Sequence, residues 1–216
     1  MPRSPARDRQ ARVQPRKTPR QARARETRRA ILEAAARVLR AEGPAAFNTN
    51  RVAEVAGVSV GSLYQYFPNK AALLFQLDVL DSKVVWEEIE ALLGDRERSP
   101  RERVDAAVER FFRSEAEEAA LRGSLRRAEA FFEHTPQIEA RNAFIRSRLR
   151  QILAELVPAA GGRDLDFDAE LFATTVASVS EAVTDRTTDP AQIGRFARAT
   201  SEMLCRQLGI EERPAR

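Results

Sequence analysis

Residues 48–70 read NTNRVAEVAGVSVGSLYQYFPNK, and this stretch decides the fold of the N-terminal part of the chain. Its first half predicts a short helix over residues 50–56, because Thr49 can cap the free N–H groups at the start of that helix. Gly57 follows, where a left-handed backbone commonly ends a helix and glycine adopts it at little cost. The segment therefore begins with one short helix and a tight turn.

A second short helix is predicted directly after this turn, over residues 60–67. Ser59 can cap its start, and Pro68 ends it because proline cannot continue a helix. Small and apolar residues recur where two crossing helices need close contact, namely at Val52, Ala53, Val58 and Leu63. Two short helices joined by a glycine-containing turn form a helix-turn-helix, which in DNA-binding proteins places its second helix in the major groove.

Residues on both sides of the motif extend this pattern. The sequence RRAILEAAARVLRAEG occupies residues 28–43, and RVAEVAGVSVGSLYQYFPNKAALL occupies residues 51–74. Together they resemble the N-terminal DNA-binding domain of the tetracycline-repressor (TetR) family of bacterial regulators, whereas the remaining chain resembles the family only in helical layout. The resemblance implies an all-α protein. In it, a three-helix helix-turn-helix domain precedes a C-terminal helical domain for ligand binding and dimerisation.

Helical spacing of apolar residues continues through the rest of the chain, and no segment shows the period of two that is typical of strands. Capping residues followed by proline mark several helix starts, as in the capping box at residues 99–102. We therefore predict about nine helices, over residues 24–42, 50–56, 60–67, 70–93, 100–118, 121–133, 136–156, 167–184 and 190–208.

The chain is expected to contain three regions. Residues 1–22 have almost no large apolar side chain to offset their chain entropy, and we expect a disordered basic arm there. A TetR-type DNA-binding domain is expected over residues 23–85, with its motif at residues 48–67. The effector-binding and dimerisation domain is expected over residues 86–210.

Positive charge is concentrated at the N-terminus. Residues 1–29 hold eleven basic side chains and two acidic ones, although the net charge of the 216-residue chain is only +4. A basic segment on a mildly acidic body points to a polyanionic partner. The arm either reaches DNA phosphates or a minor groove, or it is a solvated tail or the product of an over-long start-site assignment.

The composition argues against several other classes of protein. One cysteine, Cys205, excludes a disulfide framework, and one histidine, His134, makes a multi-ligand zinc site unexpected. The sequence has neither an apolar run near the roughly 18 residues of a membrane span nor the apolar stretch of a secretion signal. Nucleotide-binding glycine loops are absent as well. We therefore expect a cytoplasmic protein that is not an enzyme, with no catalytic residue, metal site, cofactor or membrane partner.

The DNA-binding residues are expected at the N-terminal ends of the two motif helices, where side chains can reach base edges and phosphates. The resemblance further implies that Tyr64, Tyr66 and Lys70 contact phosphates. The predicted set is Thr49, Asn50, Arg51, Ser59, Val60, Gly61, Ser62, Tyr64, Gln65, Tyr66 and Lys70. Gln65 either reads adenine or is solvated, and Tyr66 is either a contact or part of the core. No Arg or Lys lies between Ser59 and Tyr66, so specificity would rest partly on DNA shape, Arg51 or the arm.

The resemblance also implies an effector pocket inside the second domain and a homodimer interface formed by the last two helices. The pocket candidates are Trp86, Phe111, Phe112, Glu115, Phe131, His134 and Asn142. The polar members of this set are alternatively structural or solvent-facing. The predicted interface contains Phe172, Val176, Val179, Val183, Ile193, Phe196, Thr200, Met203 and Leu204. Alternatively, both of these apolar stripes face the core of the single chain.

These expectations together describe a ligand-responsive DNA-binding transcriptional regulator. We expect a repressor that binds a palindromic double-stranded DNA operator as a homodimer and is released by an unidentified small-molecule effector. Two alternatives remain open. The chain is instead an activator of the same family, or a sequence-tolerant architectural DNA-binding protein that relies on its basic arm.

Overall fold

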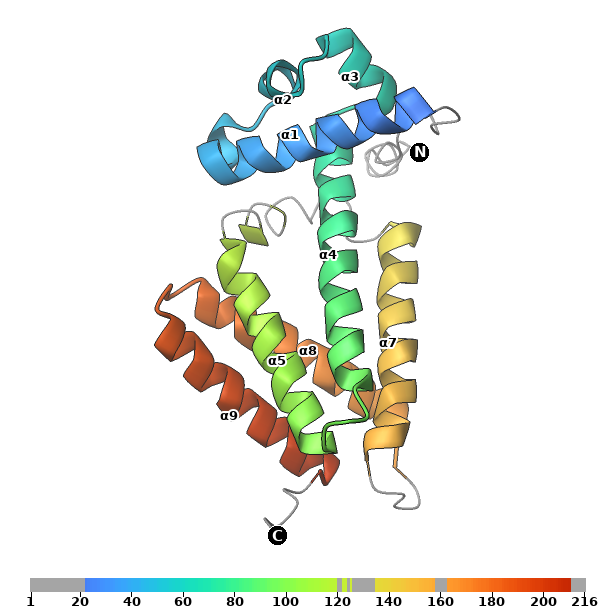
Figure 1. Cartoon of the computed structure of the whole chain (residues 1–216), viewed down its shortest axis with the longest axis vertical. Helices are drawn as coiled ribbons and strands as arrows, with labels where there is room; N and C mark the ends of the chain where they lie inside the picture. Colours follow the sequence, from blue (N-terminus) through green and yellow to red (C-terminus); the bar gives the residue numbers. More distant parts are fainter. Residues whose placement is uncertain (1–21, 120–121, 124, 126–134, 158–162, 211–216) are drawn as a thin grey trace, which may run out of the picture. The chain divides into compact units, whose positions relative to one another are not determined.

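The computed structural model describes residues 22–119, 122–123, 125, 135–157 and 163–210. These residues contain eight α-helices and no strand, which confirms the all-α prediction (Figure 1). The helices are α1 (Ala22–Ala46), α2 (Thr49–Ala56), α3 (Val60–Tyr66), α4 (Lys70–Gly94), α5 (Pro100–Glu117), α7 (Pro136–Leu156), α8 (Leu165–Thr184) and α9 (Pro190–Leu208). Most of the helix predicted over residues 121–133 lies outside the described residues.

The chain divides into two compact units, and the division falls within α4. One unit contains Met1–Ser82 and Ala120–Ile138, and the other contains Lys83–Ala119 and Glu139–Arg216. The domain boundaries proposed above from the sequence remain predictions.

The first unit packs α1 on α2 and α2 on α3, together with the first half of α4. Apolar side chains from all four helices, from the connection at Phe47 and from the start of α7 form its core, whose largest members are Ile31, Leu39, Phe47, Leu63, Phe67, Leu73, Phe75 and Ile138. Within α1 the backbone leaves the helical region at Gly43, with φ 73° and ψ 177°. The predicted end of the first helix at this glycine is therefore confirmed.

The turn of the helix-turn-helix is built as its sequence predicts, except at its first cap. Gly57 has φ 67°, and its N–H donates to the carbonyl of Ala53. The Ser59 hydroxyl accepts from the N–H of Ser62 at 3.1 Å, which starts α3. The prediction that Thr49 caps α2 is wrong, because Asn48 does so.

The first cap falls on Asn48 because that residue has the extended backbone that a cap requires, with φ −145° and ψ 161°. Its Oδ1 accepts from the N–H of Arg51 at 2.9 Å. Thr49 is already the first helical residue, and its hydroxyl bonds elsewhere. A similar bond from the N–H of Ala72 to Asn69 Oδ1, at 2.8 Å, confirms the predicted start of α4.

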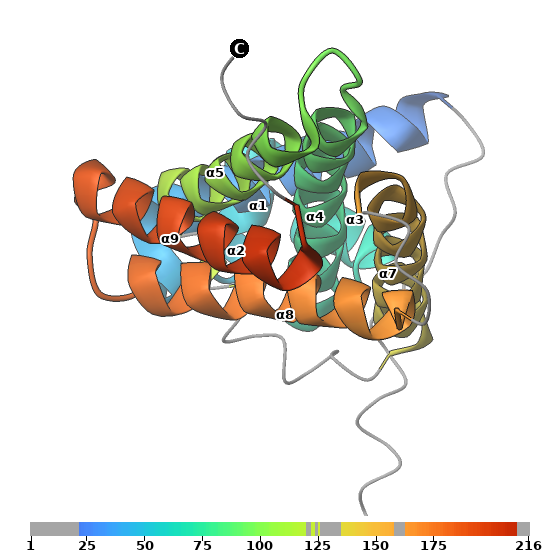
Figure 2. The same ribbon diagram turned by 90° about the horizontal axis from the view of Figure 1, so that it is seen from below.

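The second unit contains the remainder of α4 with α5, α7, α8 and α9. Helices α8 and α9 lie side by side, and α5 packs against both of them (Figure 2). The capping box at Ser99 is present, with Glu102 as its reciprocal partner, and Asp189 caps α9 ahead of Pro190. Helix α8 begins at Leu165, two residues before its predicted start, because Asp164 supplies its cap.

Candidate nucleic-acid interface

Helix α3 has one face in the core and one face in solvent. Leu63 and the following Phe67 are both fully buried and hold the helix on the first unit. Val60 and Tyr64 are each 37% exposed on the other side, next to the exposed Gly61. The N-terminal part of this short helix is therefore anchored from beneath and open to a partner from outside, as the sequence predicts for a recognition helix.

A hydrogen bond joins the two helices of the motif on this exposed side. The hydroxyl oxygens of Thr49 and Tyr64 lie 3.0 Å apart. Thr49 is the first residue of α2, where unpaired backbone N–H groups favour an anion, and Asn50 beside it is exposed. The start of α2 and the middle of α3 consequently present one joined polar surface.

The remaining polar residues of the predicted set differ in exposure. Lys70 is exposed at the start of α4, and its Nζ lies 5.3 Å from the centroid of the Phe47 ring. Gln65 is exposed, whereas Ser62 is half-buried. Tyr66 is also half-buried and packs against the core of the first unit. Its ring therefore has a packing role, and a DNA contact by its remaining surface stays a prediction.

Arg51 is held by two carboxylates that the sequence reasoning did not single out. Its Nε and Nη2 donate to one oxygen of Glu42 at 2.8 and 2.7 Å, and its Nη1 lies 2.9 Å from Glu54. The hydrogen bonds to Glu42 and then Glu54 raise the pKa of the guanidinium above its ordinary value. The spacing of Arg51 and Glu54 within one helix could have indicated the second pair, but the pair with Glu42 joins two helices.

The predicted effector residues that the structure describes lie in the second unit at different depths. Phe112 is fully buried in the core, and Glu115 is 7% exposed. Phe111 and Trp86 are half-buried and pack against the same core. The indole Nε1 of Trp86 is buried and has no hydrogen-bond partner, which is uncommon for a buried N–H donor.

The structure says less about whether the three remaining effector candidates line a pocket. Asn142 is half-buried on α7, and its Oδ1 accepts from Nε of the neighbouring Arg141 at 3.2 Å. Phe131 and His134 lie outside the described residues. The structure therefore brings five of the predicted residues into one unit and leaves their role as a pocket a prediction.

Most of the predicted dimer residues are already used by the core of the single chain. Phe172, Val176, Val183, Ile193, Thr200 and Leu204 are at most 6% exposed, and Val179 is half-buried. Phe196 and Met203, by contrast, are 49% and 53% exposed on α9. Met203 also lines an open groove with Ala199, Glu202, Arg206 and Gln207. On α9, only Phe196 and Met203 of the predicted interface residues are thus accessible to a partner.

The described part of the chain holds neither a metal-binding cluster nor a membrane-spanning helix. Its cysteine and acidic side chains form no group of three or more that could hold a metal ion. No helix within it is long and apolar enough to cross a membrane.

Comparisons with known proteins agree with this geometry. Residues 31–77 match the family model of the bacterial regulatory proteins of the tetR family. Among curated proteins, none matches the chain by sequence. Solved structures with the same fold include a proposed TetR-family transcriptional regulator from Mesorhizobium loti, with 19% identity and a TM-score of 0.66. That similarity covers 87% of this chain and 98% of the other.

Two further solved structures come from Thermus thermophilus. The TetR-family regulator PfmR has 21% identity and a TM-score of 0.61, over 85% of this chain and 99% of its own. The repressor FadR, in complex with lauroyl-CoA, has 20% identity and a TM-score of 0.61, over 88% and 98%. Residues 31–77 thus match the bacterial regulatory proteins of the tetR family, and the chain has the fold of TetR-family transcriptional regulators.

Proposed function

We propose that this chain is a ligand-responsive transcriptional repressor that binds a palindromic operator as a homodimer in the cytoplasm. The observation that carries the proposal is the anchoring of α3. Its fully buried Leu63 fixes the helix on the core, while Val60, Gly61 and Tyr64 remain exposed for a major groove. No catalytic step is part of this function.

The proposed DNA contacts divide by the chemistry of their side chains. At the start of α3, Ser59 and Ser62 supply hydroxyl groups to base edges, and Val60 can contact a thymine methyl group. Thr49 and Lys70 supply phosphate contacts from the starts of α2 and α4. Asn50, Arg51, Gly61, Tyr64, Gln65 and Tyr66 complete the set.

Dimerisation is proposed because a palindrome presents two half-sites to two copies of α3. On α9, Phe196 and Met203 are the exposed apolar side chains that a second copy would cover. The buried members of the predicted interface contribute by holding α8 and α9 in place. Phe196→Asp should therefore weaken dimerisation without unfolding the chain, and sedimentation measures this directly.

Release by a small molecule is proposed to act through the second unit, where Trp86 Nε1 is a buried donor without a partner. An acceptor on a ligand could satisfy this group. Lauroyl-CoA, the ligand in the Thermus thermophilus FadR structure, is a reasonable first probe. If lauroyl-CoA does not bind, it is excluded as the effector, and the proposed binding of DNA is not tested by that result.

The function is tested by fluorescence anisotropy at one salt concentration, with a duplex from the region upstream of the gene and a scrambled duplex of equal length. We expect at least about a hundredfold preference for the first, a modest value for a specific DNA-binding protein. Lys70→Ala should weaken binding to both duplexes, whereas Lys83→Ala, which alters an exposed lysine of the second unit, should not. Equal affinity of the unmodified protein for both duplexes would refute specific regulation.

A further inference from the structure

Arg51 is a cation at the proposed DNA surface, and its charge is more than balanced by two neighbouring carboxylates. All three nitrogens of its guanidinium contact carboxylates, two of them on Glu42 and the third on Glu54. The three side chains together carry a formal charge of −1. A phosphate that approaches this cluster therefore meets net negative charge rather than a free arginine.

The cluster lies beside the proposed phosphate site at the start of α2. Arg51 is two residues after Thr49, the first residue of that helix, and its own N–H is bonded to the Asn48 cap. The charge of the cluster therefore acts at short range on any phosphate bound there, and it opposes the favourable N-terminus of α2.

The two carboxylates hold Arg51 unequally. Glu42 accepts two bonds and its side chain is 30% exposed, whereas Glu54 makes one contact and is 70% exposed. An ion pair this exposed contributes little stability and exchanges readily with another anion. The Glu54 carboxylate is thus the partner that a phosphate can displace, and Glu42 is the partner that keeps the guanidinium oriented.

We propose that Glu54 limits the affinity of this protein for DNA by competing with a backbone phosphate for Arg51, while Glu42 positions the arginine for that exchange. The inference rests on the proposed DNA-binding function and adds to it two acidic residues that determine affinity. A bound phosphate takes the Nη1 side of the guanidinium, and the Glu54 side chain turns to solvent.

The test replaces Glu54 by an uncharged residue of the same shape. Removing one negative charge about 7 Å from a phosphate in water strengthens binding about threefold per subunit, and about tenfold for a dimer. Each additional phosphate that the protein neutralises steepens the dependence of log K on log salt by about 0.9. Glu54→Gln should show both effects, on the operator and on a scrambled duplex alike, since phosphate contacts do not depend on sequence.

The matched control is Glu33→Gln on α1, where Glu33 makes a 3.5 Å ion pair with Arg29 and is similarly exposed. The same change of net charge there should leave the salt slope unaltered. Adding Arg51→Ala to Glu54→Gln should abolish the steeper slope. Urea unfolding of each variant checks that the fold is retained.

Two results would overturn the inference. One is an equal change in DNA affinity and salt slope for Glu54→Gln and Glu33→Gln, which would show that binding responds only to net charge. The other is a salt dependence of log K that stays steeper in the Glu54→Gln protein after Arg51→Ala is added. If the unmodified protein binds the operator and the scrambled duplex equally, the proposed regulator is refuted. The inference about Glu54 is tested separately, because it depends on the ratio of the affinities of the variant and the unmodified protein for either duplex.

Discussion

Gly61 offers a test in which stability and DNA binding move in opposite directions. It lies in the first turn of α3, and an added Cβ would meet no atom within 4 Å. Because its backbone is already helical, Gly61→Ala reduces the freedom of the unfolded chain and should stabilise the fold by about 0.5 kcal/mol. In a complex with DNA the same methyl group would enter the space between α3 and the duplex.

The loss of affinity follows from the packing of that interface. Inserting a methyl group into a well-packed contact costs about 1–3 kcal/mol. At the lower limit, two half-sites lose about 2 kcal/mol, which raises Kd roughly thirtyfold. Urea unfolding measures the increase in stability, and fluorescence anisotropy with the operator duplex at fixed salt measures the loss of binding.

Two other glycines serve as controls because an added Cβ also meets open space there. Gly94→Ala, at the end of α4, should stabilise slightly and leave Kd unchanged. Gly57→Ala should destabilise by about 1 kcal/mol, because φ is 67° at that turn. A Gly61→Ala protein that is more stable and still binds the operator with the unmodified Kd would refute the placement of α3 in the groove.

Three further predictions concern stability and the N-terminal segment. Arg163→Ala should cost about 3 kcal/mol in urea unfolding, because it leaves Asp168 buried without its 2.5 Å partner and removes the donor to two carbonyls at the end of α9. The hydrogen bonds from Ser99 lower the pKa of Glu102 below 4.5, so its stabilising effect is complete above pH 4.5 and is lost as the pH falls further. Unfolding of Glu102→Gln between about pH 3 and 7 should lack that component. Removing residues 1–22 should weaken binding to operator and scrambled duplexes equally and flatten the salt slope, as gel shifts at two salt concentrations can show.

Helix ends could be predicted from the sequence because caps and turns are local. Gly57, Ser59 and Asn69 each act within three or four residues of themselves, and the structure places all three as expected. The error at the start of α2 has the same local origin. Asn48 and Thr49 are both good caps, and only the backbone conformation decides between them.

Which face of a helix is buried was harder to predict, since it depends on neighbours far along the chain. The helical spacing of apolar residues on α4 runs through Leu80, Val84 and Ile89, but Leu80 and Val84 are 44% and 56% exposed. Ile89 is buried in the second unit, together with Val85, which that spacing does not include. The contact between Arg51 and Glu42 was missed for the same reason, because it depends on the path of the chain through Gly43.

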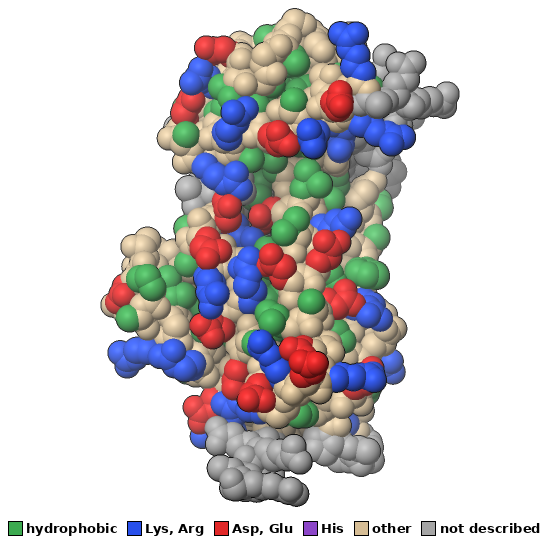
Figure 3. Space-filling model, in the orientation of Figure 1, with side chains coloured by type: hydrophobic (Ala, Val, Ile, Leu, Met, Phe, Trp, Pro, Cys, Tyr) green, Lys and Arg blue, Asp and Glu red, His purple; other side chains and the backbone are tan. Residues whose placement is uncertain are grey.

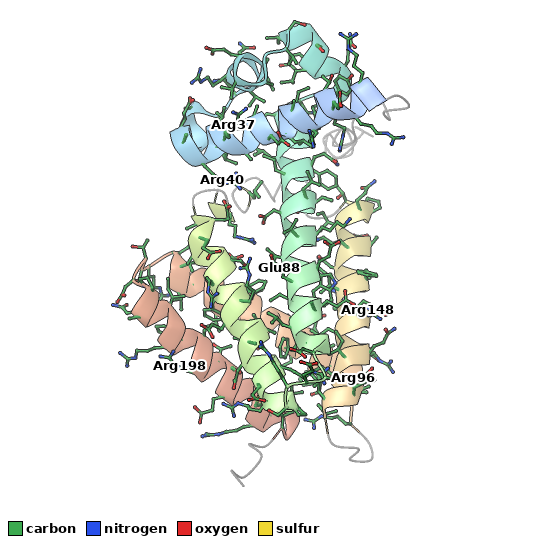
Figure 4. All side chains as sticks on the ribbon, in the orientation of Figure 1. Arg37, Arg40, Glu88, Arg96, Arg148 and Arg198 are labelled. Carbon is green, nitrogen blue, oxygen red and sulfur yellow. The ribbon has the colours of Figure 1, made fainter. Side chains whose placement is uncertain are left out.

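Helix α4 limits what kind of effector could operate the protein. It is one helix from Lys70 to Gly94, and in its second half Glu88 pairs with Arg110 of α5 and Glu90 pairs with Arg148 of α7. Figure 4 shows Glu88 on α4 and Arg148 on α7. Acidic and basic side chains are interspersed over this unit, so such pairs are common on its surface (Figure 3). The side chains of these two pairs are between 25% and 45% exposed, and a pair that solvent reaches in this way contributes about 1 kcal/mol.

An effector must move almost all of the protein from the DNA-binding conformation to one that does not bind DNA. To do so it must bind the second conformation more tightly than the first by about 5.5 kcal/mol. Rearranging two surface ion pairs supplies less than half of that difference. We infer that most of the remainder, about 3.5 kcal/mol, comes from apolar surface that only the ligand-bound state buries, which at about 25 cal/mol per Å² corresponds to about 140 Å². The α4 side chains that are buried in the second core, Val85, Ile89 and Leu93, are apolar. An effector of this protein should therefore carry a substantial apolar part, and a small, fully polar metabolite should not release it from DNA.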